Sequence, residues 1–478
     1  MNLKRQWPIL LLWLVIGAGG TWGLANDDAG KTAPTEPAVN QLTKPEQALF
    51  DAVKVGDTDQ VKKLIADGVD VNCRPAPEWE TPLFVAIEYD RSVIVQLLID
   101  AGADIHAKVG HFRYINGKPC TLNPPVRAYQ FALLQNYTSV KVVSILLNAG
   151  ADVNEVFKKA EALCVESPSR ENHAGFSHRM IGMPDSTPLI AVLSKYSLKG
   201  YNPIFSKANG DVAIYLIEHG ADLTAMSKNR ETALQLAISS RYRRAAMLLI
   251  EKGVLNHMTL GQKQVAFNMA LLTGFVPMMK ILKANGVTLP EARNRLLGIA
   301  IQRCHLAGIR ILLEMGASPV PEHFGDCSLE PPVVEVMTCG RYAVGKPLSY
   351  LQDTVHALLK YGADINQSNC RGQYPLGIAI SMRQDTIQQN LNQIEMLLSM
   401  GADVNRFQAK GPSPLALAIQ KKSKKIVELL LNHGADPAHP IRDEYGTTLT
   451  PVGFARKLGA QDIVNLLTEC QSERKENL

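Results

Sequence analysis

The chain has 478 residues, 46% of them hydrophobic, and a formal net charge of +5. This length exceeds the roughly 100–200 residues of one compact domain, so we expect either several domains or a repeat array. The near balance of charges argues against a nucleic-acid partner, because proteins that bind nucleic acids carry a strongly basic face.

The first 25 residues differ from the rest of the chain. Lys4 and Arg5 precede a run that is uncharged from Trp7 to Ala25, and Gly23 and Ala25 are small residues of the kind that a signal peptidase requires. We therefore predict a cleaved signal peptide over residues 1–25, a periplasmic or secreted mature protein, and no membrane contact after cleavage. A retained membrane anchor is the alternative, because the apolar run approaches the length that spans a bilayer.

Short segments without apolar periodicity are predicted at both ends of the mature chain. Residues 26–43 carry prolines and polar residues and are typical of a flexible leader, and residues 471–478 are predicted to be a disordered, charged tail. The repeat array is therefore expected between residues 44 and 470.

A glycine follows each leucine-rich stretch of the chain and marks a repeated joint. The joint glycines are Gly68, Gly102, Gly150, Gly220, Gly253, Gly286, Gly316, Gly362, Gly401 and Gly434. Their successive spacings are 34, 48, 70, 33, 33, 30, 46, 39 and 33 residues. A period near 33 with insertions accounts for these values and indicates a fold of stacked repeats.

Residues 80–104 illustrate the repeated unit. Thr81 can cap a helix whose first turn contains Pro82, where a missing amide hydrogen is no loss. Ala86 is small enough to let neighbouring helices approach, and Leu98 of a second helix recurs as part of a leucine pair that builds the core between units. Gly102 follows the second helix, where a left-handed residue can satisfy the last carbonyls.

These features resemble the ankyrin-repeat family. The motifs that carry the resemblance are Thr81-Pro82-Leu83, Thr187-Pro188-Leu189, Thr232-Ala233-Leu234, Tyr374-Pro375-Leu376 and Ser413-Pro414-Leu415. Each is followed by a helix pair and a joint glycine, which begins a Gly-Ala-Asp sequence in all but the Thr232 unit. The resemblance implies an all-α solenoid of about 11 helix-pair units with β-hairpin fingers. It further implies a concave surface that binds one or more proteins, and neither catalytic residues nor a cofactor.

The middle of the chain departs from this pattern. The joints at Gly253 and Gly286 lack the Ala-Asp pair, and the units over residues 257–289 and 290–320 lack the Thr-Pro-Leu start. We therefore expect short or missing fingers in these units and an interruption of the groove.

Four units carry insertions. Those after Gly102 and Gly150 follow a joint and are placed on the fingers, whereas residues 197–210 and 382–392 are expected to lengthen the link between the two helices of a unit. The first insertion contains an aromatic and basic run, which predicts a contact site for a partner protein, since aromatic and arginine side chains dominate interface energies. A loop that packs its own aromatics on the neighbouring finger is the alternative. The predicted protein-binding residues are His111, Phe112, Arg113 and Tyr114, with Glu88 and Tyr89 on an inner helix.

The sequence contains no Gly-x-Ser-x-Gly, phosphate-loop or His-Glu-x-x-His motif. The residues closest to a metal site are Cys164, His173 and His178 in the second insertion, and they have no evident fourth ligand at short spacing. A polar loop without a metal is the simpler interpretation, and we predict no metal site.

The chain has eight cysteines. In an oxidising compartment an even number permits disulfides, although sequence alone does not assign them. Cys73 and Cys120 lie in adjacent fingers, and we rank this pair first and Cys327 with Cys339 second. Unpaired thiols are the alternative.

The sequence thus predicts an exported, monomeric, non-enzymatic scaffold for protein–protein interactions. Two other functions remain open: an inhibitor or immunity protein that occludes an exported toxic enzyme, and a metal-dependent enzyme that uses the insertion at residues 155–185.

Overall fold

The computed structural model describes residues 42–76, 79–113, 119–134, 139–157, 161–164, 186–194, 203–289, 293–320, 330–339, 347–382, 387–406, 412–442 and 447–476. These residues form 22 α-helices, one 3-10 helix and five short strands. The predicted signal peptide, and the leader up to residue 41, lie outside the described residues. Among the described residues, no helix has the length and apolar character needed to cross a membrane.

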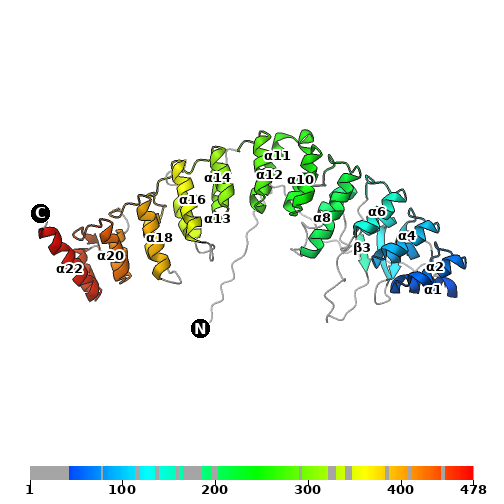
Figure 1. The fold of residues 1–478 in the computed structure, drawn as a ribbon, viewed down its shortest axis with the longest axis horizontal. Helices are drawn as coiled ribbons and strands as arrows, with labels where there is room; N and C mark the ends of the chain where they lie inside the picture. Colours follow the sequence, from blue (N-terminus) through cyan, green and yellow to red (C-terminus); the bar gives the residue numbers. More distant parts are fainter. Residues whose placement is uncertain are drawn as a thin grey trace, which may run out of the picture.

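The helices alternate along the chain between two rows (Figure 1). The inner row comprises α1 (Lys44–Val55), α3 (Pro82–Glu88), α5 (Ala128–Leu134), α7 (Pro188–Ser194), α9 (Ala233–Ser239), α11 (Leu260–Thr273), α13 (Arg293–Gln302), α15 (Pro332–Cys339), α17 (Pro375–Ser381), α19 (Pro414–Gln420) and α21 (Pro451–Lys457). The outer row comprises α2 (Thr58–Ala66), α4 (Ser92–Asp100), α6 (Val140–Asn148), α8 (Pro203–Glu218), α10 (Arg243–Glu251), α12 (Val276–Ala284), α14 (Leu306–Glu314), α16 (Leu348–Lys360), α18 (Ile387–Ser399), α20 (Lys424–Asn432) and α22 (Gln461–Glu476).

The helices of a unit pack against each other, and each inner helix packs against the next inner helix. The resulting 11 pairs form one curved array from α1 to α22 (Figure 1). This arrangement confirms the predicted solenoid. The array extends past its predicted end, because α22 continues to Glu476, so residues 471–476 are helical rather than a disordered tail.

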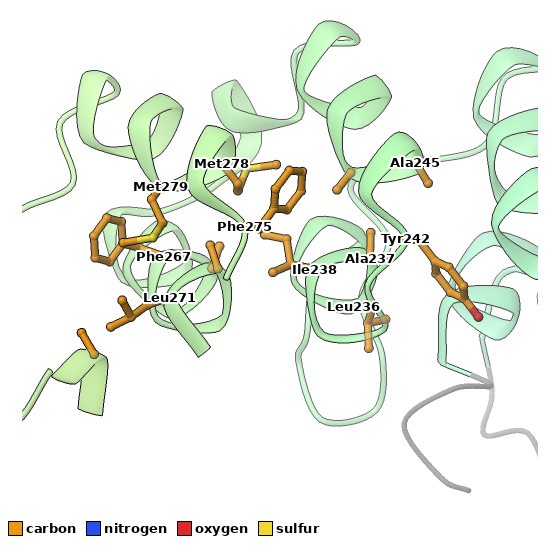
Figure 2. Packing of buried hydrophobic residues seen from close by; sticks show 14 of the residues in the cluster. Leu236, Ala237, Ile238, Tyr242, Ala245, Phe267, Leu271, Phe275, Met278 and Met279 are labelled. Atoms are coloured by element: carbon orange, nitrogen blue, oxygen red, sulfur yellow. The ribbon is translucent and has the colours of Figure 1, made fainter. Parts of the chain in front are cut away.

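One continuous apolar core runs through the array from Leu49 to Leu467. Figure 2 shows part of it, where side chains of α9, α11 and α12 meet in the layers between successive units. Phe267 and Met279 are among the buried side chains there, with 1% and 0% of their surface exposed. Burial of one such side chain contributes about 1.5–3 kcal/mol, so the stack is held together mainly by contacts between neighbouring units.

All ten joint glycines have a positive φ, between 81° at Gly68 and 101° at Gly150. The predicted left-handed closure of the second helix is therefore confirmed. At Gly150 the backbone conformation is the reason for glycine, because an added Cβ would meet no atom within 4 Å.

In part of the array, asparagine side chains form hydrogen bonds between one joint and the next. Asn72 donates from Nδ2 to the carbonyl of Gly102 at 3.0 Å and accepts from the amide of Asp104 at 2.8 Å. Asn154, Asn366 and Asn405 make the same pair of hydrogen bonds to the following joint. Each such asparagine stands four residues after its own joint glycine and fixes the spacing of two successive units.

Within the described residues most fingers are turns. The finger before α21 is a short hairpin of β4 (Ile441–Arg442) with β5 (Thr448–Leu449), and the strands of the insertions are described below. In the unit after Gly253 the finger is replaced by the 3-10 helix η1 (Val254–His257), and no strand occurs in the fully described stretch of residues 203–289. The expectation of a missing finger in this middle unit is confirmed.

Two expectations about local structure need correction. Thr81 occupies the N-cap of α3, but its side chain makes no capping hydrogen bond, whereas Thr232 forms a full capping box on α9. Residues 197–210 and 382–392 were expected to lengthen the link between the two helices of a unit. Most of their residues instead belong to the second helix of that unit. The outer helices α8, with 16 residues, and α18, with 13, exceed the nine residues of α4.

Candidate protein-binding site

The two finger insertions are built together into one sheet, which we call the finger sheet. It consists of β1 (Val109–Arg113) and β2 (Pro119–Val126) from the first insertion and β3 (Glu161–Cys164) from the second. The order is β1-β2-β3 and both pairings are antiparallel. In Figure 1 the strands lie beneath α6, on the inner side of the curved array. Two neighbouring fingers therefore present one continuous backbone surface.

The base of the finger sheet is anchored in the array. Val109 and Val126 pair across β1 and β2 and are both fully buried. Directly after β2, the guanidinium of Arg127 lies 2.5 Å from the carboxylate of Glu155 in the next finger, and both side chains are half-buried. A charge-assisted bond of this kind is stronger than one between neutral groups, so it ties the roots of the two insertions together.

The second insertion leaves the array through a closed neck. Phe157 and Ser186 exchange both backbone hydrogen bonds, at 3.0 and 3.2 Å, so the chain departs and returns at the same place. The ring of Phe157 is buried and packs edge-on against Tyr129 of α5, with 5.8 Å between ring centroids. This contact fixes the root of the insertion on an inner helix.

Tyr129 carries a buried polar atom at this root. Its side chain is 2% exposed, and its hydroxyl has no hydrogen-bond partner among the described residues. Burial raises the pKa of the Tyr129 hydroxyl above its ordinary value, and the charges of Asp152 and Glu155 act in the same direction. The hydroxyl is therefore neutral at physiological pH and available as a hydrogen-bond donor.

The predicted contact residues divide between described and undescribed positions. His111, Phe112 and Arg113 lie on β1, and Tyr114 lies outside the described residues. Phe112 stands opposite Cys120 of β2 in the register. The run is therefore part of a sheet that joins two fingers, and it is not confined to an isolated loop.

The second group of predicted contact residues lies at the end of the inner helix α3. Tyr89 is 37% exposed and Glu88 is half-buried. Burial raises the pKa of Glu88 to about 7, the neighbouring carboxylate of Glu80 adds to this shift, and Lys54 opposes it. Glu88 therefore changes charge near neutral pH, at the turn that leads from α3 to α4.

The turn after α3 is held in place by its neighbours. Arg91 donates from Nη2 to the backbone carbonyls of Lys54 and Val55 at 3.2 and 3.1 Å, at the end of α1. Asp90 has a φ of 51° and accepts a hydrogen bond from the Ser139 hydroxyl at 2.7 Å. Tyr89 and Glu88 are consequently presented on a braced turn.

Comparison with known proteins agrees with this architecture. A model of the family described as ankyrin repeats (3 copies) matches residues 24–109, 342–441 and 386–477. A protein of Escherichia coli (strain K12) named as a putative ankyrin repeat protein, YahD, is 27% identical over a 223-residue alignment, and the match covers 42% of this chain and 94% of the relative. The chain is an ankyrin-repeat protein. The finger sheet lies almost wholly in the part of the ankyrin array that the family model does not match, between residues 109 and 342.

Of the two predicted cysteine pairs, the structure contradicts the first, and one member of the second lies outside the described residues. Cys73 is a buried, free thiol, so the structure does not contain the bond to Cys120 that we ranked first. Cys120 instead stands opposite Cys164 in the pairing of β2 with β3. Of the second pair, Cys339 ends α15 and Cys327 lies outside the described residues.

The metal hypothesis concerns residues that are mostly outside the described part of the chain. Cys164 lies on β3, whereas His173 and His178 are not among the described residues. Within the ranges that the structure describes, no group of three or more His, Cys, Asp or Glu side chains could hold a metal ion.

Sequence reasoning missed the pairing of the two insertions and the bond between Arg127 and Glu155. Some signal was present, because both insertions follow joints of adjacent ankyrin units and each contains one cysteine. Strand pairing between segments some 40 residues apart depends on where the helices place them, which the local sequence does not reveal.

Proposed function

We propose that this ankyrin-repeat protein is an exported, non-enzymatic scaffold that binds a partner protein through the finger sheet and the turn that ends the inner helix α3. The observation that carries the proposal is that two insertions are joined into one sheet on the inner side of the array. The apolar core runs through the units of the array, and Val109 and Val126 root the sheet in it. Structure added to the fingers and rooted by buried residues therefore serves a purpose other than stacking.

Exposed aromatic and apolar residues of these units support a protein partner. Tyr89 is 37% exposed at the end of α3, and Val156 is 64% exposed at the neck of the second insertion. Protein interfaces concentrate their binding energy in aromatic and arginine side chains that become desolvated on contact. Phe112 and Arg113 on β1 supply these residue types on the same fingers.

A braced surface also favours binding, because less conformational entropy is lost when the partner docks. The bond between Arg127 and Glu155, the neck at Phe157 and the contacts of Arg91 all restrict the roots of this surface.

The test is a comparison of two double variants with the wild-type protein. The native partner is captured from extract, identified, and its affinity measured with the purified proteins. We expect Phe112→Ala with Tyr114→Ala to weaken binding about 30-fold or more, equivalent to about 2 kcal/mol, the scale of interface hot spots. The control variant is Tyr361→Ala with Ile387→Ala, which removes exposed side chains (39% and 44%) at the end of α16 and the start of α18.

Equal affinities for both variants and the wild type would contradict binding through β1. If the captured partner is an exported enzyme whose activity the protein abolishes, the scaffold acts as an inhibitor.

Export is tested separately. The segment up to Ala25 contains three of the four tryptophans of the chain, so cleavage leaves Trp79 alone. N-terminal sequencing of protein from the native host is expected to begin near Asn26. Recovery of a membrane-bound form that starts at Met1 would contradict cleavage.

A further inference from the structure

Two cysteines stand opposite each other across the seam between the two insertions. In the antiparallel pairing of β2 with β3, Cys120 is the register partner of Cys164. Directly opposite residues of an antiparallel pair have α-carbons about 4.5 or 5.5 Å apart, depending on the hydrogen-bonding pattern. Both distances fall within the roughly 4.4–6.8 Å that a disulfide requires, and opposite residues lie on the same face of a sheet.

We propose that Cys120 and Cys164 form a disulfide that clasps the finger insertions of two adjacent ankyrin units together. The register assigns each cysteine one partner, and the segment between them contains one complete helix pair, α5 and α6. The clasp links the far end of the sheet, whereas the bond between Arg127 and Glu155 ties its base.

Cys73, Cys304 and Cys370 do not compete for these partners. Cys73 is buried and free in the core of the first units, where burial and the charges of Glu46 and Asp70 raise its pKa to about 12. The thiolate is the form that attacks a disulfide, so Cys73 is a poor participant in exchange. Cys304 and Cys370 are free and belong to later units of the array.

The bond forms by ordinary thiol–disulfide exchange. The thiolate of one cysteine attacks oxidised glutathione, or the disulfide of a protein oxidant, and forms a mixed disulfide with release of one thiolate. The thiolate of the second cysteine then attacks its partner's sulfur and displaces the second glutathione. The two cysteines lose two electrons and two protons in all, and one oxidised glutathione becomes two reduced glutathione molecules.

The position of the clasp connects it with the predicted contact residues. Phe112 is the register partner of Cys120, which is the partner of Cys164, so the three residues form one row across the sheet. A disulfide in this row limits the separation of β2 from β3. Because β1 pairs with β2, the disulfide also restricts the position of Phe112. The inference does not rest on partner binding or on export, because it requires only an oxidant.

The test maps the bond in the full-length wild-type protein. The reduced, folded chain is equilibrated with oxidised and reduced glutathione, quenched, alkylated and digested with trypsin without reduction. Cys120 is the only cysteine in the tryptic peptide of residues 114–127, and Cys164 is the only cysteine in that of residues 160–170. We expect mass spectrometry to find these two peptides joined, and to find them separate after reduction.

Recovery of peptide 114–127 alkylated at Cys120 after oxidation would overturn the proposal. So would a link between that peptide and the one of residues 64–91, which contains Cys73. In folded Cys164→Ser protein, Cys120 is expected to become alkylated, whereas the control Cys370→Ser, which removes an exposed free thiol, keeps the link.

Hydrogen exchange provides a second measurement. We expect oxidation to slow amide exchange in β2 and β3 by about ten-fold or more, since a cross-link restricts local opening. Exchange in the distant helices α19 and α20 is expected to stay unchanged. Equal exchange of β2 and β3 in the reduced and oxidised protein would show that no clasp restrains the sheet.

Discussion

Replacement of Glu335 by glutamine is expected to remove a pH dependence from the stability of the middle of the array. Glu335 lies on α15, is 9% exposed, and accepts a hydrogen bond from Gln302 Nε2 at 2.7 Å. Burial raises the pKa of Glu335 from 4.5 to about 7; the bond from Gln302 lowers it, and Glu330 raises it further. Gly298 of α13 leaves space for the carboxylate, because a Cβ there would lie 3.3 Å from Glu335 Oε2.

The sign follows from proton binding. The folded state holds the proton more tightly than the unfolded state, so the free energy of unfolding of the wild type falls as the pH rises from about 4.5 to about 7. A pKa difference of this size corresponds to about 3 kcal/mol at most. The substituted glutamine side chain stays neutral and keeps an acceptor oxygen for Gln302. Glu335→Gln is therefore expected to match the wild type near pH 4.5 and to exceed its stability by up to about 3 kcal/mol at pH 8.

Urea unfolding followed by circular dichroism at pH 5 and pH 8 measures this difference. Hydrogen exchange of α13 and α15 localises it, because units of a repeat array unfold partly independently. Glu251→Gln is the matched control, since Glu251 is exposed at the end of α10. An equal stability difference between variant and wild type at both pH values would refute the assignment of the proton to Glu335.

Three further substitutions test how the array is held together. Asn154→Ala removes two hydrogen bonds to the next joint, of 3.0 and 2.7 Å, and is expected to cost about 1–3 kcal/mol, with faster amide exchange at that joint. Gly401→Ala, at a φ of 94°, is expected to destabilise by about 1–2 kcal/mol, whereas Gly261→Ala, in α11 with open space around it, is expected to stabilise by about 0.5–1 kcal/mol; thermal unfolding distinguishes the two. Leu98→Ala, at a fully buried core position, is expected to cost about 2–5 kcal/mol in the same assay.

The stacking of the array could be predicted from the sequence because it depends on local and periodic features. The joint glycines need a left-handed conformation wherever a second helix ends, and all ten have it. Leucine pairs recur near the end of the second helix in most units, and one leucine of each pair, such as Leu98 or Leu249, is fully buried. Neither feature requires knowledge of a distant segment.

The candidate site could be predicted only in part, because it depends on distant segments. The aromatic run on β1 was found from its composition, but the partner strand of β2 comes from the next finger. The pKa shift of Glu88 depends on its burial beside Glu80, which only the packed structure shows. The cap at Thr81 also failed as a local prediction, since its hydroxyl makes no capping bond although the residue stands at the N-cap.

The distribution of joining asparagines indicates why the finger sheet lies where it does. Asn72 and Asn154 bridge joints on either side of the first insertion, and Asn366 and Asn405 bridge joints near the C-terminus. At the four joints from Gly220 to Gly316 no asparagine occupies the position four residues after the glycine, so the middle units depend on their apolar core. Polar bridges fix spacing more specifically than apolar contacts, because their geometry is directional. The joint at Gly102 also has no asparagine at this position, which His106 occupies, so an asparagine does not set its spacing to Gly150. The finger sheet spans these two units, and its strand pairing and the bond between Arg127 and Glu155 supply directional polar links where the asparagine is missing.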